Sequence, residues 1–303
     1  MTENRLYKVL VLMSTYNGEK YLAEQLDSIK KQEAVCVSVM IRDDGSTDNT
    51  VNIISQYAKD MDIKLYTGDN LRPAKSFWNL VQEASLEYDY YAFSDQDDYW
   101  EADKLRIAID KLEMLNVEKP AMYYSGQKLV DSQLNEIGNH VLDNCRSRYA
   151  NYVFNQVAGC TVVFNKKLLE YAKLSKDINL HMHDSYLYRL CAALDGEFII
   201  EPQGHILYRQ HLNNEVGLQY SLKGKLGLFK EHLYSQAPRN DAKTIMNIYE
   251  QYISKEWKCF LQDIINVDKS FKIKRRMLCS KLMKFNSLKI RATYIIKVLF
   301  SKF

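Results

Sequence analysis

The chain has 303 residues, of which 47% are hydrophobic and 26% charged, and this composition suits a globular protein with a large core. Only four prolines occur and no low-complexity tract is present, which argues against long flexible linkers. The six cysteines form no C-x-x-C pair and no zinc spacing with histidine, so we expect reduced core cysteines of a cytosolic protein.

The net charge of +3 conceals a strong asymmetry along the chain. Residues 221–303 carry 18 Lys and Arg against 6 Asp and Glu, a net charge of +12, whereas the remainder has a net charge of −9. No acidic residue follows Asp268. The sequence therefore predicts an acidic body with a basic tail.

The first third of the chain alternates between strand and helix patterns. The run "YKVLVLMS" at the start has no polar alternation, so it predicts a strand covered on both faces rather than a signal peptide. Strands are expected at 7–14, 35–44, 63–68 and 88–95, and helices at 17–32, 45–60, 72–85 and 101–116. This order predicts βαβ units and a mostly parallel sheet.

The pattern changes after residue 120. Shorter strands are expected at 121–131, 159–165 and 196–211, with a helix at 183–194 between them. We take this part, about 119–218, as the second half of the same domain, after a nucleotide-binding half at about 1–118. Residues 219–303 then form a helical, basic C-terminal region.

Three polar clusters follow the predicted parallel strands: "STYNG", "DDGSTD" and "SDQDD". Ligands of such sheets bind outside the carboxyl ends of the strands. Asp95 and Asp97 leave a strand two residues apart, so the pleat places both side chains on one side, where they could hold Mg²⁺ or Mn²⁺. Neither phosphate-loop motif, G-x-G-x-x-G or G-x-x-x-x-G-K-[ST], is present, and a calcium loop would need glycine where Trp100 stands. A nucleoside diphosphate completing the metal shell is the natural partner.

Six motifs together, in order, resemble those of family-2 glycosyltransferases with the GT-A fold: "STYNGEKYLAEQLDSI", "RDDGSTDNT", "FSDQDDYW", "GCTVVFN", "HDSYLYRL" and "YRQH". The similarity is greatest to the bacterial rhamnosyltransferase-like branch and covers about residues 8–215. It implies a Rossmann-like central sheet flanked by helices, and an enzyme that uses a nucleotide-sugar donor.

The resemblance also implies roles for residues that bind the donor. Thr15, Tyr16 and Asn17 should line the nucleobase pocket, and Asp44 should hydrogen-bond the base. Lys75 should approach the donor, which is expected to be a nucleotide-diphosphate sugar.

A second set of roles concerns the reaction itself. Asp95 should contact the ribose or the sugar, and Asp97 should bind the metal. Asp184 matches the catalytic base, while Arg209 and His211 should lie over the diphosphate, with His211 a further metal ligand. Many relatives have Glu before the base, whereas this chain has His183.

Simpler structural interpretations stay open for several of these residues. "DDGSTD" alone is typical of a turn with a helix cap, and Asp184 could cap the helix that it begins. His211 could be a surface histidine. Trp100 could stack on a sugar or pack against the next helix.

The function that these motifs predict is an inverting, metal-dependent transfer of a sugar, L-rhamnose from dTDP-L-rhamnose, to a saccharide. The acceptor would be a growing bacterial surface polysaccharide or a lipid-linked oligosaccharide, as in capsule or cell-wall synthesis. Alternatives are the same reaction with UDP-glucose or UDP-galactose, a nucleotidyltransferase, and a non-catalytic nucleotide-sugar-binding scaffold. Nucleic acid is not expected as a partner, because aromatic and basic residues do not interleave in the tail.

The basic tail has an apolar stripe when residues 270–303 are taken as one helix, which Asn286 and Ser287 could break in two. Its members are Leu278, Leu282, Phe285, Leu288, Ala292, Ile295, Leu299 and Phe303. We expect this helix to lie on an anionic membrane surface, on the inner face of a bacterial plasma membrane. The alternatives are packing on the catalytic domain or a contact within a homodimer.

Overall fold

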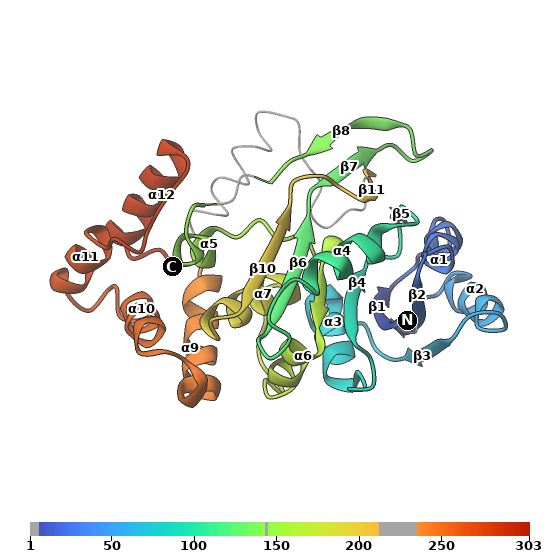
Figure 1. The fold of residues 1–303 in the computed structure, drawn as a ribbon, viewed down its shortest axis with the longest axis horizontal. Helices are drawn as coiled ribbons and strands as arrows, with labels where there is room; N and C mark the ends of the chain where they lie inside the picture. The colour runs from blue at the N-terminus through green and yellow to red at the C-terminus, as the bar shows by residue number, and fades with distance from the viewer. Residues whose placement is uncertain (1–5, 143–144, 212–234) are drawn as a thin grey trace.

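We describe a computed structural model, in which residues 6–142, 145–211 and 235–303 are placed. Its centre is a seven-stranded sheet in the order β10-β6-β9-β4-β1-β2-β3 (Figure 1). All neighbouring pairs are parallel except those of β9 with β4 and β6. The predicted mostly parallel α/β sheet is therefore confirmed. Its strands are β1 (Tyr7–Thr15), β2 (Val35–Asp43), β3 (Ile63–Thr67), β4 (Tyr90–Ser94), β6 (Ala121–Ser125), β9 (Val163–Asn165) and β10 (Glu197–Glu201).

Helices cover both faces of this sheet, which is why β1 has an unbroken apolar run. Val9, Val11 and Met13 pack in one core cluster, with residues of α1 and α4. Leu10 and Leu12 face the other cluster, with residues of α3, α6 and α7. The helices are α1 (Leu22–Lys30), α2 (Thr50–Tyr57), α3 (Arg72–Glu83), α4 (Lys104–Leu112), α5 (Arg148–Phe154), α6 (Lys166–Ala172) and α7 (His183–Ala193).

A second sheet, in the order β5-β11-β7-β8, lies beside the carboxyl edge of the first. The sequence predicted 121–131 and 196–211 as single strands, but each divides between the two sheets. Gly126 and Gly204 allow this, because a Cβ on Gly126 would lie 2.4 Å from the carbonyl oxygen of Pro202 and one on Gly204 would lie 2.8 Å from Cα of Gln127. The strands are β5 (Tyr99–Trp100), β7 (Gln127–Val130), β8 (Glu136–His140) and β11 (Ile206–Arg209).

The cysteine prediction was wrong for half of the cysteines. Cys145, Cys160 and Cys191 are buried, whereas the other three are exposed, and all six lie within the described residues as free thiols. The exposed ones are Cys36, near the start of β2, and Cys259 and Cys279, at surface positions of C-terminal segments.

Two C-terminal helices, α9 (Ala237–Tyr249) and α10 (Lys255–Ile265), pack in the same core cluster as α3, α6 and α7. Arg189 of α7 forms a buried ion pair with Asp241 at 2.6 Å. The Trp257 indole N–H donates to Asp195 at 3.0 Å. A short 3₁₀ turn, η2 (Glu250–Tyr252), joins the two helices. The predicted domain boundary near residue 218 lies outside the described residues.

The tail is not one helix, so no single stripe runs along residues 270–303, and a second helix starts at the break that the sequence allowed at Asn286 and Ser287. It forms α11 (Phe271–Leu278) and α12 (Leu288–Leu299), at the end of the molecule opposite β3 (Figure 1). Ser287 caps α12, since its side chain accepts a hydrogen bond from the N–H of Lys289, and the chain bends before it. Among the described residues, no helix has the length and apolarity needed to cross a bilayer.

Candidate active site

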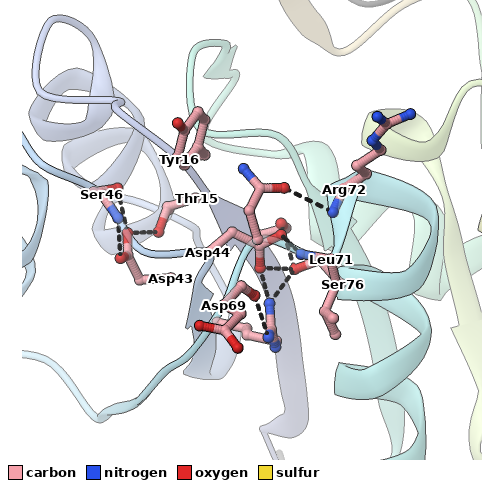
Figure 2. Close-up of polar contacts among 12 residues, drawn as sticks. Thr15, Tyr16, Asp43, Asp44, Ser46, Asp69, Leu71, Arg72 and Ser76 are labelled. Carbon is pink, nitrogen blue, oxygen red and sulfur yellow. Dashed lines mark hydrogen bonds and ion pairs between the residues drawn. The ribbon is translucent and has the colours of Figure 1, made fainter.

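The carboxyl ends of β1 and β2 form a polar cradle (Figure 2). The Thr15 hydroxyl donates to Asp43 at 2.9 Å, and Asp43 also accepts from the N–H and the hydroxyl of Ser46 at 2.8 and 2.6 Å. These bonds tie the end of β1 to the loop after β2. Thr15 therefore lies in this cradle together with Asp43, to which sequence reasoning gave no role, and its predicted contact with a nucleobase stays a prediction.

Asp44 lies buried beside this cradle with its carboxylate held from three directions (Figure 2). It accepts from the N–H of Leu71 and the hydroxyl of Ser76, both at 2.8 Å, and pairs with the Arg42 guanidinium. Burial lowers the pKa of Arg42. A carboxylate has about four lone-pair positions, so Asp44 retains capacity to accept from a base.

The Tyr16–Asn17 turn closes the cradle from above. The Gln96 side chain bonds both the N–H and the carbonyl of Tyr16, at 2.9 and 3.1 Å, while the Tyr16 ring stays exposed. Asn17 has φ of +47° and its amide oxygen accepts from the N–H of Thr47 at 2.9 Å. Lys75 stands exposed on the first turn of α3. The aromatic ring of Tyr16 and the ammonium group of Lys75 are therefore both exposed in this part of the protein.

Asp97 and His211 meet at the same sheet edge. The Asp97 carboxylate lies 2.9 Å from Nε2 of His211. The Tyr21 ring stacks on His211 with ring centroids 5.3 Å apart, and the Arg209 guanidinium lies 4.3 Å from the centre of the same Tyr21 ring. His211 is therefore a positioned imidazole next to a carboxylate.

Arg209 is fully buried, and its guanidinium bonds the protein on every nitrogen. It donates to the carbonyl of Asp97 at 2.9 Å, to that of Ser132 at 2.6 Å and to the Glu24 carboxylate at 2.6 Å. In this structure Arg209 thus holds the loop that carries Asp97. Its predicted place over a diphosphate stays a prediction.

The loop after β4, residues 95–98, carries three carboxylates with different surroundings, and we call it the acidic loop. β4 ends at Ser94, so the pleat that was expected to align Asp95 with Asp97 does not extend to them, and that part of the prediction was wrong. Asp95 groups with Asp98 and the Cys160 thiol, with ligand atoms within 4.8 Å of one another. Asp98 is fully buried and accepts from the N–H of Arg209 at 3.1 Å.

Lys104 is a buried cation whose charge interacts with Asp98. Burial lowers its pKa to about 7, and burial together with Asp97 and Asp95 raises the pKa of Asp98 well above the usual value. The Lys104 ammonium lies 3.6 Å from the centre of the Trp100 ring. Trp100 is itself buried, so the packing alternative holds and sugar stacking does not.

Asp184 stands in the first turn of α7, buried, with one oxygen accepting from the N–H of Ser185 at 2.6 Å. Met182 occupies the N-cap position, so Asp184 is not the cap residue. His183 stacks on Phe77 at 4.1 Å and meets Phe93 edge-on at 4.7 Å. Burial lowers the His183 pKa to about 4, and neither ring nitrogen has a hydrogen-bond partner among the described residues.

The turn η1 (Gly159–Thr161) lies in space between the acidic loop and Asp184. Cys160 belongs to the group with Asp95 and Asp98. A Cβ on Gly159 would lie 2.9 Å from Nε2 of His183 and 3.5 Å from a carboxylate oxygen of Asp184. Only Gly159 and Cys160, two consecutive residues, therefore link the candidate metal-binding loop in space to the candidate base.

Substituting Gly159 by Ala tests this junction. The added methyl group would displace the His183 ring and, through it, the adjoining Asp184, and a shift of about 1 Å in a reacting group can cost about 10²-fold. We expect kcat to fall by about that factor while the melting temperature shift caused by the donor is kept. Steady-state kinetics and thermal denaturation measure both, and an unchanged kcat would contradict the placement of Asp184.

Asp97 and His211, whose ligand atoms lie 2.9 Å apart on two loops, are one candidate pair for a divalent ion, and their predicted role as metal ligands stays a prediction. Asp95 and Asp98 add further carboxylates nearby. Sequence reasoning missed the supports of this site. Tyr21 and Glu24, three residues apart at the start of α1, were a visible signal, because residues at that spacing share a helix face.

The mostly parallel, Rossmann-like sheet with an acidic loop at its carboxyl edge has the architecture of the GT-A fold. Solved structures agree on the fold. The chain matches TarS 1-349 of S. aureus in complex with UDP-GlcNAc with a TM-score of 0.57 and 19% identity, covering 95% of this chain and 78% of that one. It matches a mannosyltransferase of Pyrobaculum calidifontis in complex with GDP-Man and Mn2+ with a TM-score of 0.51 and 16% identity, over 99% and 89% of the two chains.

Sequence comparisons identify the family. The model of the glycosyl transferase family 2 matches residues 10–172. The chain is 36% identical to the dTDP-rhamnosyl transferase RfbG of Shigella flexneri, over 73% of this chain and 80% of that protein. It is 27% identical to the UDP-Glc:alpha-D-GlcNAc-diphosphoundecaprenol beta-1,3-glucosyltransferase WfgD of Escherichia coli, over 60% and 68%. The chain belongs to the glycosyl transferase family 2.

Proposed function

We propose that the protein is an inverting, metal-dependent rhamnosyltransferase, which moves L-rhamnose from dTDP-L-rhamnose to a saccharide acceptor. The observation that carries this proposal is the adjacency of the acidic loop and Asp184 across Gly159 and Cys160. The similarity to RfbG supports the donor. The acceptor is a growing surface polysaccharide or a lipid-linked oligosaccharide, and the name of WfgD, which includes GlcNAc-diphosphoundecaprenol, supports the second.

The donor's base enters the cradle of β1 and β2. Tyr16 supplies an exposed ring for the base to stack on, and Asn17 borders the pocket. Asp44 accepts a hydrogen bond from the base, since its carboxylate is already oriented by Arg42 and Ser76. Lys75 and Asp95 lie toward the phosphate and sugar ends.

The diphosphate lies at the Asp97–His211 pair, which would hold Mn²⁺ or Mg²⁺. The pair departs from the all-oxygen shell that Mg²⁺ prefers, which favours Mn²⁺. When bound, the ion stabilises the negative charge that builds on the leaving diphosphate. The Arg209 guanidinium donates to the carbonyl of Asp97, which keeps Asp97 in place and puts a positive charge behind that residue.

Asp184 acts on the acceptor. Its carboxylate takes the proton of an acceptor hydroxyl as the oxygen bonds to the anomeric carbon, on the face opposite to the diphosphate. The bond from the anomeric carbon to the phosphate oxygen breaks in the same displacement, and the anomeric configuration inverts. His183 is a neutral imidazole beside this carboxylate, so it adds no competing positive charge.

A UDP-hexose is the second candidate donor, favoured by the similarity to a transferase that uses UDP-Glc. Thermal denaturation with Mn²⁺ and single nucleotide sugars separates the two. A donor at one hundred times its dissociation constant adds about 2.7 kcal/mol of stability. We expect dTDP-L-rhamnose to raise the melting temperature most, with dTDP and UDP alone as controls. A larger shift with UDP-glucose or UDP-galactose would replace the proposed donor, and no shift with any of them would contradict nucleotide-sugar binding.

A further inference from the structure

Helix α12 buries a mixed polar and apolar face and leaves other large apolar side chains exposed. Its buried residues are Thr293, Tyr294, Lys297 and Val298. Lys297 is fully buried, and its ammonium donates to the carbonyls of Ser235 at 3.3 Å and Lys302 at 2.6 Å. Burial lowers the pKa of this lysine to about 8. Tyr294 and Val298 anchor the helix in the core, whereas a helix that only packed on the protein would not leave its other large apolar side chains outside.

The opposite face of α12 is apolar and exposed. Leu288 is 83% exposed and Phe300, just past the helix, 68%, while Ile295, Ile296 and Leu299 are between 37% and 46% exposed. Leu288, Ile295 and Leu299 are seven and four residues apart and so share one line along the helix, and Ile296 and Phe300, four residues apart, lie beside it. Single exposed apolar residues are common on proteins, but a continuous stripe marks an interaction surface.

Helix α11 extends this surface. The Tyr294 hydroxyl donates to the carbonyl of Met277 at 3.2 Å and the Lys274 ammonium to that of Leu299 at 2.6 Å, so the two helices run antiparallel. Phe271, 79% exposed, therefore lies near the end of α12 that carries Phe300. We define the outer apolar face as Phe271, Leu288, Ile295, Ile296, Leu299 and Phe300.

The charges around this face have one sign. All eleven charged residues of 269–303 are Lys or Arg. Lys272, Arg275, Lys289 and Arg291 are exposed on the same two helices. An apolar face bordered by cations is complementary to a bilayer surface with anionic headgroups, into which such a helix lies with its apolar side down.

We propose that the outer apolar face binds a lipid bilayer that contains anionic lipids, and so holds the catalytic domain on the inner face of a bacterial plasma membrane. A lipid-linked acceptor would then be presented to Asp184 from the same surface. The membrane contact itself does not depend on the proposed donor or on sugar transfer.

A second copy of the chain fits this face less well. In a two-fold dimer the same surface meets itself, which would bring basic residues against basic residues. Pairing with the acidic part of another copy would not close into a dimer. The charge pattern therefore favours lipid over self-association.

Vesicle flotation of the full chain, without donor or acceptor, tests the proposal. We expect the protein to float with vesicles of phosphatidylcholine and phosphatidylglycerol at low salt, and not with phosphatidylcholine alone. Replacing Ile296 and Phe300 together by Ser should lower the partition coefficient by about 10- to 100-fold through lost apolar burial. Replacing Lys272, Lys289 and Arg291 by Gln should lower it and reduce its dependence on salt.

The matched control is Met114→Ser with Val117→Ser, which removes two apolar side chains that are 79% and 63% exposed after α4. It should float like the wild type. The proposal is overturned if the wild type does not float, or if the α12 variant floats equally well. It is also overturned if light scattering shows a dimer that only the α12 variant dissociates, because the face would then bind a second copy. The donor-induced melting shift of each variant reports separately on the catalytic site.

Discussion

The variant Asp184→Asn should lose about 10²- to 10⁴-fold in kcat and retain its affinity for the donor. Asn keeps the shape of the side chain and its hydrogen bond from Ser185, but it cannot take a proton from the acceptor hydroxyl. Asp184 is buried beside Gly159, so bulk water cannot take its place as the group that accepts the proton. Turnover with saturating donor and the donor-induced melting shift measure the two quantities separately.

Asp110→Asn is the control for this substitution, because Asp110 is exposed and pairs only across one helix turn with Arg106, at 3.4 Å. It should leave kcat unchanged. If Asp184→Asn retained wild-type turnover, another group would be the base. If the variant also lost the donor-induced shift, Asp184 would belong to the donor pocket and the proposed displacement would need a different proton acceptor.

The variant Asp97→Asn should abolish most metal-dependent turnover. An amide is a neutral and weaker ligand than a carboxylate, and loss of even outer-shell partners of a metal costs about 10- to 100-fold in affinity or activity. The substitution keeps the carbonyl that accepts from Arg209, so the loop should stay in place. We expect kcat/KM to fall by more than about 100-fold at a fixed Mn²⁺ concentration, with partial recovery at higher concentrations.

His211→Gln is the companion variant, since it removes the second candidate ligand from the other loop. Its loss should be smaller than that of Asp97→Asn, because a neutral imidazole contributes no charge to the site. Equal activity of Asp97→Asn and the wild type at every metal concentration would show that the ion, if any, binds elsewhere.

The sequence predicted the central sheet well because its physical signal is strong. Strands buried on both faces need continuous apolar runs, and β1 has one, with alternate residues serving the two core clusters. The carboxyl ends of parallel strands meet at one edge, so the cradle at Thr15 and Asp43 and the loop of Asp97 were expected at the same rim.

The arrangement within the acidic loop could not be read from periodicity. The loop leaves the sheet at Ser94, and from there tertiary contacts decide which carboxylate is buried. Asp98 is buried because the N–H of Arg209 bonds it, and Asp97 stays near the surface with His211. Both contacts join residues more than one hundred positions apart, a separation that no local pattern encodes.

The basic tail shows what an amphipathic pattern in a sequence can and cannot predict. Its spacing correctly indicated that Leu288, Ile295 and Leu299 share a helix face. A pattern identifies a face but not what covers it, and here the face that includes Lys297 turned to the protein while the apolar one stayed exposed. The partners of the buried lysine, Ser235 and Lys302, explain why that orientation is tolerated.

Titration of Mn²⁺ by electron paramagnetic resonance, in the presence of dTDP, tests most directly whether a divalent ion is held at Asp97. The signal of free Mn²⁺ should disappear until one ion is bound per wild-type chain, and Asp97→Asn should require at least about 10- to 100-fold more metal for the same occupancy. If the wild type and Asp97→Asn bound Mn²⁺ equally well, or if the wild type bound none while still transferring sugar, the metal site and the reaction built on it would both be contradicted.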